Sequence, residues 1–200
     1  MSGQFLETLR GLQKKMSKLF SIDASTNSLA FAVFDGKELV QYGKINFSGN
    51  TVYEKVSDAA RKCVEFFKLF PGIGNLVIEH TVFMNSPKTA ADLALVQGAL
   101  LGAAAQAGIK LSGAVNPIAW QNYLGNKKMT KDEQFKLTQE HPGRSKSWYK
   151  KLERDIRKQR TMKLIEINYD RIITDNDVAD AIGIGHYAIN NWDKVVDKNG

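Results

Sequence analysis

The chain has 200 residues, 43% of them apolar, which is enough to build one domain with a sizeable core. Its net charge is +7, and its single cysteine, Cys63, excludes an internal disulfide and a zinc site made of cysteines. No apolar run approaches the length of a membrane span, and the N-terminus lacks the continuous apolar stretch of a secretion signal. We therefore expect a soluble, cytoplasmic protein without a membrane partner.

Residues 1–18 form the first predicted element, an amphipathic helix. Apolar residues recur there at steps of three or four, and lysines lie off that stripe. The stripe consists of Phe5, Leu9, Leu12, Met16 and Leu19. We expect this helix to pack on its own domain or on a second subunit. A membrane-surface or targeting helix is the alternative, and Glu7 counts against it.

The following residues predict strands and helices in alternation. Asp35-Gly36 is a strong hairpin signal, so the first strands run antiparallel. Strands are predicted at 18–24, 29–34, 39–47, 75–79 and 109–115. Helices are predicted at 51–70, 89–107, 116–123, 146–169 and 174–192, the last with Thr174 as N-cap. The spacing of Gly98 and Gly102 predicts close packing of the second helix. The order predicts a mixed five-stranded α/β sheet covered by helices on both faces.

A basic segment spans residues 127–160. It holds twelve Lys/Arg and five acidic residues, an excess of seven that equals the net charge of the whole chain. Binding to a phosphate backbone uses such a surface, and a solvated helix with Glu/Lys pairs is the alternative. The residues expected to contact nucleic acid are Lys150, Lys151, Arg154 and Arg157. Trp148 and Tyr149 either stack on nucleic acid or anchor a surface helix.

Four carboxylates predict a metal site. Asp23 and Glu79 each follow a short apolar run, and Asp177 and Asp180 are three apart, so both point the same way on a helix. Buried acids repel one another unless a cation joins them, and Mg²⁺ prefers oxygen ligands. Asp175 is explained by capping alone. Two ions about 4 Å apart would suit phosphodiester hydrolysis, one activating water and the other stabilising the leaving oxygen.

With these residues the chain resembles the RuvC-type Holliday junction resolvases of the RNase H-like superfamily. The matching motifs are Asp23 in SIDAST, Glu79 in VIEH, and Asp177 with Asp180 in D-x-x-D-A. Supporting context lies in VFM at 82–84, LALVQGALLGAAAQAG at 93–108 and NPIAWQNYLGNKK at 116–128. The resemblance runs from about residue 18 to residue 190 and is nearest to phage-type members, which would act in the cytoplasm of a bacterial host.

The resemblance implies a fold, an activity and site residues. It implies an RNase H-like nuclease domain at 19–192 with a basic insertion at 141–160, after the helix at 1–18 and before a tail at 193–200. It also implies a homodimer that binds four-way DNA junctions and nicks two strands symmetrically, in recombination and repair. Asp23, Glu79, Asp177 and Asp180 would be the catalytic ligands of Mg²⁺, for which Mn²⁺ can substitute. Phe83, Lys127 and Lys128 would contact DNA, and Phe83 is equally consistent with packing.

Two departures from the family pattern stand beside this resemblance. The family has glycine and serine after the first aspartate, where this chain has Ala24-Ser25-Thr26-Asn27, and one extra residue separates Glu79 from Phe83. The N-terminal helix and the insertion have no counterpart in the compact bacterial enzymes.

The four carboxylates, the basic segment and the resemblance together predict a magnesium-dependent endodeoxyribonuclease acting on Holliday junctions. The alternatives are a broader nuclease that cuts forks and flaps or RNA in a hybrid, and a non-catalytic junction-binding protein, which the four intact acids disfavour.

Overall fold

A five-stranded mixed sheet forms the centre of the computed structural model, which describes residues 18–80 and 86–196. The strands are β1 (Leu19–Ala24), β2 (Ser28–Asp35), β3 (Glu38–Asn46), β4 (Asn75–Glu79) and β5 (Lys110–Val115). Their order across the sheet is β3-β2-β1-β4-β5. The β1–β2 and β2–β3 pairs are antiparallel, whereas β4 runs parallel to β1 and β5 parallel to β4. The predicted mixed α/β sheet is confirmed, and the predicted helix at 1–18 lies outside the described residues except for Lys18.

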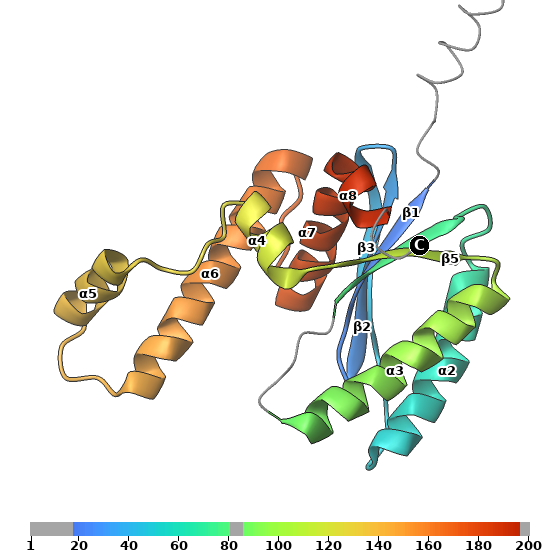
Figure 1. Cartoon of the computed structure of the whole chain (residues 1–200), viewed down its shortest axis with the longest axis horizontal. Coiled ribbons are helices and arrows are strands. Elements are labelled where there is room, and N and C mark those ends of the chain that lie inside the picture. Colours follow the sequence, from blue (N-terminus) through green and yellow to red (C-terminus); the bar gives the residue numbers. More distant parts are fainter. Residues whose placement is uncertain (1–17, 81–85, 197–200) are drawn as a thin grey trace, which may run out of the picture.

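Helices cover both faces of this sheet (Figure 1). The helices are α2 (Val52–Lys68), α3 (Pro87–Gln106), α4 (Pro117–Tyr123), α5 (Lys131–Glu140), α6 (Lys146–Tyr169), α7 (Asn176–Asn190) and α8 (Trp192–Val196). Side chains alternate between faces along a strand, so Phe20 packs toward α2 and α3, and its neighbour Leu19 packs toward α7. The two resulting cores hold the sheet between its helical layers.

Capping side chains determine where the helices begin. Thr51 and Glu54 form a capping box at the start of α2, and Ser86 caps α3. At α7 the predicted N-cap, Thr174, is wrong by one residue. Asp175 takes that place because its Oδ1 accepts hydrogen bonds from the backbone N–H groups of Asp177 (2.8 Å) and Val178 (3.2 Å).

The helix α5 and the N-terminal half of α6 (residues 146–156) project from the sheet domain as a helical arm (Figure 1). At its tip the Tyr149 hydroxyl donates to the His141 carbonyl, and the Trp148 ring lies edge-on to His141 at 5.1 Å between centroids. Arg144 stacks over Trp148 at 5.2 Å. These contacts show the aromatic pair anchoring the connection between α5 and α6.

The C-terminal part of the described chain returns to the sheet. Residues 193–196, placed in a tail by the sequence pattern, belong to α8, where Val195 is buried. A Cβ atom at Gly113 of β5 would lie 2.6 Å from Val195 Cγ1, so the glycine admits this helix against the strand. Across the described chain no helix is long and apolar enough to span a membrane.

Helix α7 lies unusually close to the sheet. Ser21 Oγ of β1 donates to the Ala181 carbonyl at 2.7 Å, and both residues are buried. A Cβ atom at Gly185 would overlap the Phe34 ring and approach Ser21 Oγ to 2.5 Å. By contrast, Cβ atoms at Gly98 and Gly102 would meet nothing within 4 Å among the described residues, so the predicted close packing there is absent.

This packing predicts opposite effects of one substitution at two helical glycines. Gly185→Ala should lower the free energy of unfolding by about 1–3 kcal/mol, because the Phe34 ring and Ser21 must move. Gly102→Ala is the matched control and should raise it by up to about 1 kcal/mol through helix propensity. Urea unfolding followed by circular dichroism measures both. Equal stability of the two variants would contradict the close approach of α7.

Candidate functional site

Sheet register brings Asp23 and Glu79 to one face. Asp23 lies next to the end of β1, opposite Ala30 of β2, and Glu79 ends β4. Ile22 pairs with Ile78 in the parallel β1–β4 ladder, so the residues that follow them point the same way. This is the face that α7 covers, as the burial of Ala30 and Val77 with α7 residues shows. Two acidic side chains therefore lie at the ends of the neighbouring strands β1 and β4, on the face that α7 covers.

Helix α7 supplies the other two carboxylates. Asp177 lies in its first turn and Asp180 one turn on, next to the Ala181 carbonyl that Ser21 binds. Asp23 experiences the charges of Glu79, Asp180 and Asp177, and Asp180 experiences those of Glu79 and Asp177. The structure thus gathers all four acids that the sequence singled out within mutual electrostatic range.

Burial and mutual repulsion make ionisation of this group costly. Burial, reinforced by Glu79, Asp180 and Asp177, raises the pKa of Asp23 to about 8, while Lys44 opposes the rise. Burial, with Glu79 next in size, raises the pKa of Asp180 to about 7, and Lys158 and Arg157 of α6 counter part of it. The pKa of Glu79 is raised by burial as well.

Trp120 of α4 orients Glu79. Its indole Nε1 donates to Glu79 Oε1 at 2.8 Å, which favours the ionised carboxylate. The indole ring is fully buried and lies so close to α7 that a Cβ atom at Gly183 would meet it at 2.7 Å. Trp120 therefore links Glu79 on β4 with the helix that carries Asp177 and Asp180. The sequence pattern placed Trp120 on a short helix and did not assign it to the site.

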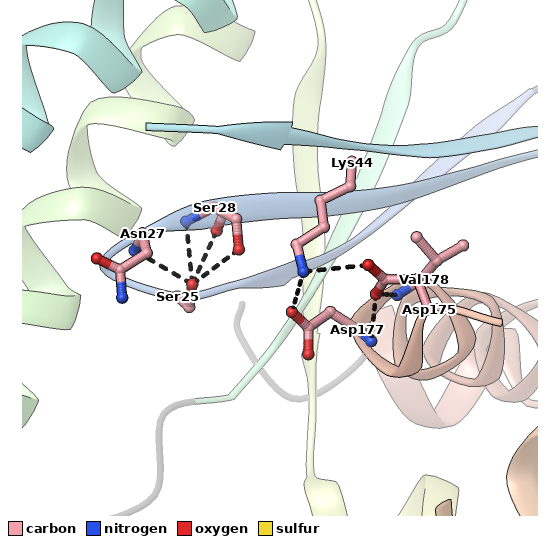
Figure 2. Close-up of polar contacts among 7 residues, drawn as sticks. All are labelled: Ser25, Asn27, Ser28, Lys44, Asp175, Asp177 and Val178. Atoms are coloured by element: carbon pink, nitrogen blue, oxygen red, sulfur yellow. Dashed lines mark hydrogen bonds and ion pairs between the residues drawn. The ribbon is translucent and has the colours of Figure 1, made fainter. Parts of the chain in front are cut away.

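Lys44 of β3 is the second side chain that the sequence pattern missed. Its Nζ lies 2.5 Å from Asp177 Oδ2 and 3.2 Å from Asp175 Oδ2, as Figure 2 shows. Beside them the turn after Asp23 is held by Ser25, whose Oγ accepts the backbone N–H groups of Asn27 and Ser28. The site is therefore acidic with one lysine built into its rim.

The donor set fits a hard divalent cation in kind. It consists of four carboxylates that are partly shielded from water and that repel one another, and oxygen donors of this type suit Mg²⁺. Within residues 18–80 and 86–196, however, no three Asp, Glu, His or Cys side chains stand close enough together to hold a metal ion. Asp177, in particular, is engaged with Lys44. The chemistry favours a metal site, and a coordination sphere is not formed in this arrangement.

The predicted DNA contacts that the structure describes lie in different segments. Lys127 and Lys128 are exposed in the segment between α4 and α5, and Phe83 lies outside the described residues. Lys150, Lys151 and Arg154 are exposed on the helical arm. Among the described residues, Lys127 and Lys128 therefore lie in a different segment from Lys150, Lys151 and Arg154.

Arg157 differs from the other predicted contacts because it is partly buried. It donates to Gln121 Oε1 at 2.7 Å and to the Asn126 carbonyl at 3.4 Å, which ties α6 to the segment after α4. The positive charges of Arg157 and Lys158 oppose part of the rise in the pKa of Asp180. Arg157 therefore has a structural role that the sequence pattern did not predict, and its contact with DNA stays a prediction.

Comparison with known proteins shows the fold. No family model matches the chain, and no curated protein matches it in sequence. The structure of Thermus thermophilus RuvC in complex with a Holliday junction substrate is similar, with a TM-score of 0.61 and 16% identity over 88% of this chain and 95% of that chain. Thermus thermophilus RuvC alone gives 0.59 and 17% over 89% and 97%.

A third structure, the yeast mitochondrial Holliday junction resolvase Ydc2, covers 99% of this chain and 89% of its own at a TM-score of 0.48 and 14% identity, and no argument rests on it. At these identities the likeness establishes an RNase H-like α/β fold, as predicted. The assignment to phage-type members stays a prediction.

The raised pKa of Asp23 predicts that removing its charge stabilises the metal-free protein. The unfolded chain ionises Asp23 near its ordinary pKa of 3.8, whereas the folded chain resists until about 8, so wild-type stability is lost as pH rises through this window. Asp23→Asn escapes that loss. Its advantage in unfolding free energy should be on the order of 1–3 kcal/mol larger at pH 8 than at pH 5. Thermal unfolding in EDTA measures it, and a variant less stable than wild type at pH 8 would contradict the prediction.

Proposed function

We propose that this protein is a Mg²⁺-dependent, structure-selective endonuclease that resolves four-way DNA junctions by paired symmetric nicks. The observation that carries the proposal is the gathering of Asp23, Glu79, Asp177 and Asp180 at one edge of an RNase H-like sheet. The raised pKa values of Asp23, Glu79 and Asp180 mean that their ionisation in the metal-free fold is costly. These carboxylates are understandable as ligands held ready for cations.

Each residue of the site has a distinct part in this proposal. The four carboxylates would hold two Mg²⁺ ions, or Mn²⁺ in their place, which when bound would activate water and stabilise the leaving oxygen of a phosphodiester. Trp120 fixes one Glu79 oxygen by its hydrogen bond and leaves the other available. Arg157 and Lys158 of α6 bring positive charge to the side of Asp180, where a DNA phosphate would enter.

Branched DNA is the proposed substrate. The similar Thermus thermophilus RuvC was solved in complex with a Holliday junction substrate, and the helical arm of this chain would supply further DNA contacts. Exposed Lys150, Lys151 and Arg154 on that arm would contact backbone phosphates away from the cut. Phe83 remains a proposed contact to bases near the junction centre, and Lys127 or Lys128 a proposed contact near the cut phosphate. A homodimer would match the two-fold symmetry of the junction. The assignment to phage-type members is a separate part of the proposal.

Cleavage of synthetic substrates tests the activity. The wild-type protein should nick a four-way junction symmetrically in Mg²⁺ and leave it intact in EDTA. Asp23→Asn should lose at least about 10²-fold in rate, the scale on which loss of an essential group acts in other active sites. Because the same change is expected to stabilise the fold, loss of activity cannot be attributed to unfolding.

Control variants and substrates decide between the alternatives. Asp193→Asn removes an exposed acid of α8 and should cut as wild type does. Equal cutting of forks, flaps and junctions would instead indicate a general debranching nuclease. Junction binding without cleavage in any metal would indicate a non-catalytic binding protein and contradict the proposal.

The exposed cations of the helical arm lead to a prediction about DNA affinity. Changing Lys150, Lys151 and Arg154 together to glutamine should weaken junction binding and reduce the slope of log K against log salt by roughly 2–3, because three phosphate contacts are lost. Fluorescence anisotropy between 50 and 200 mM salt, about the range over which such slopes are measured, provides the readout.

A charge-matched control separates contact from overall charge. Arg61, Lys62 and Lys68 lie on α2, over the opposite face of the sheet from α7. Changing these three to glutamine alters the net charge equally and should leave the slope near the wild-type value. An equal loss of affinity in both triple variants would mean that the arm makes no specific contact.

A further inference from the structure

We propose that Lys44 is a built-in counter-cation of the acidic site, which holds Asp177 in the metal-free protein and must release it when a divalent cation binds. This inference rests on the proposed metal-dependent function, because it describes how the same site is regulated. It assigns to a residue of β3 a control over metal affinity that neither the carboxylate pattern nor the fold indicates.

The sheet register directs Lys44 toward the acids. Asp23 of β1 pairs with Ala30 of β2, and Ala30 pairs with Lys44 of β3, so the three side chains form one row on one face. Ala30 is fully buried and has only a methyl group. The long lysine side chain can therefore extend over it toward α7, where its Nζ lies between Asp177 and Asp175 (Figure 2).

The ion pair to Asp177 is well formed and partly shielded. Nζ and Oδ2 are 2.5 Å apart, and the Lys44 side chain is 25% exposed, against 41% for Asp177. Asp175 is held at 3.2 Å, although its other oxygen already caps α7. Lys44 also moderates the raised pKa of Asp23, so its charge acts on the site beyond the contacting pair. One side chain thus supplies positive charge both to the start of α7 and to the strand β1.

An ammonium group and a divalent cation compete for the same carboxylate. A cation bound by Asp177 would stand within a few ångströms of Nζ, and like charges at that range repel. Binding therefore requires Asp177 to exchange its lysine for the metal, and the lost ion pair subtracts from the affinity. A lysine in this position reduces the repulsion among the metal-free acids and at the same time weakens metal binding.

Removal of the charge on Lys44 tests this competition. Lys44→Gln should bind Mn²⁺ more tightly than wild type by roughly two- to fivefold, the size of a partly exposed ion pair. Lys44→Arg keeps the charge and should bind as wild type does. Isothermal titration with Mn²⁺ in the absence of DNA measures the affinity without any dependence on cleavage, and thermal unfolding in EDTA confirms that each variant is folded.

Lys62→Gln is the matched control. It removes a lysine that pairs with Asp58 at 2.7 Å on α2, far from α7 in the fold, and should leave Mn²⁺ affinity unchanged. Unchanged or weaker binding by Lys44→Gln, while wild type binds Mn²⁺, would overturn the counter-cation role alone. Absence of Mn²⁺ binding in wild type and in Lys44→Gln alike would overturn the metal site itself. Binding by Lys44→Gln only would support the inference most directly.

Discussion

The structure depends on one constraint, which is that four partly buried carboxylates must be held together although they repel one another. Burial, and after it the charges of the neighbouring acids, raises the pKa values of Asp23 and Asp180. Side chains of α4, β3 and α6 reduce the electrostatic cost of this arrangement. Trp120 donates to Glu79, Lys44 pairs with Asp177, and α6 turns Arg157 and Lys158 toward Asp180. The rest of the domain can be understood as the scaffold that keeps these charges from separating.

The scaffold acts through close packing of α7 on the sheet. Gly183 and Gly185 let the helix approach Trp120 and Phe34, and the Ser21 hydroxyl binds the Ala181 carbonyl one residue after Asp180. Larger residues at the two glycines would push the helix outward and carry its aspartates away from the sheet. The site is therefore held by apolar packing on the α7 face, because the charges themselves favour separation. The apolar packing of α7 on the sheet offsets the electrostatic cost of holding the acids together.

Much of this was predictable from the sequence, and the exceptions have a physical reason. Asp23 and Glu79 were found because an acid directly after an apolar run is costly, and Asp177 with Asp180 because three-residue spacing fixes a common direction. The mixed sheet followed from the order of strand and helix patterns. The catalytic role of the four carboxylates remains a prediction. Lys44 and Trp120 were missed because their positions depend on strand register and on how α4 packs, which no local pattern encodes.

The same reasoning explains why the basic segment was only partly understood. Charge counting treats Arg157 and Lys150 alike, but α6 buries one end of the segment and exposes the other. At the buried end Asn126 donates to Thr161 at 2.7 Å, and within the described residues Asn126 Oδ1 and Arg157 Nε lack hydrogen-bond partners. Such groups are costly, so this polar junction is not explained by stability alone. The junction lies at the middle of α6, where Arg157 and Lys158 act on Asp180, whereas the exposed cations of the arm lie in the first half of the helix. Because α6 is continuous from Lys150 to Lys158, the exposed cations of the arm and the cations near Asp180 are held on one helix.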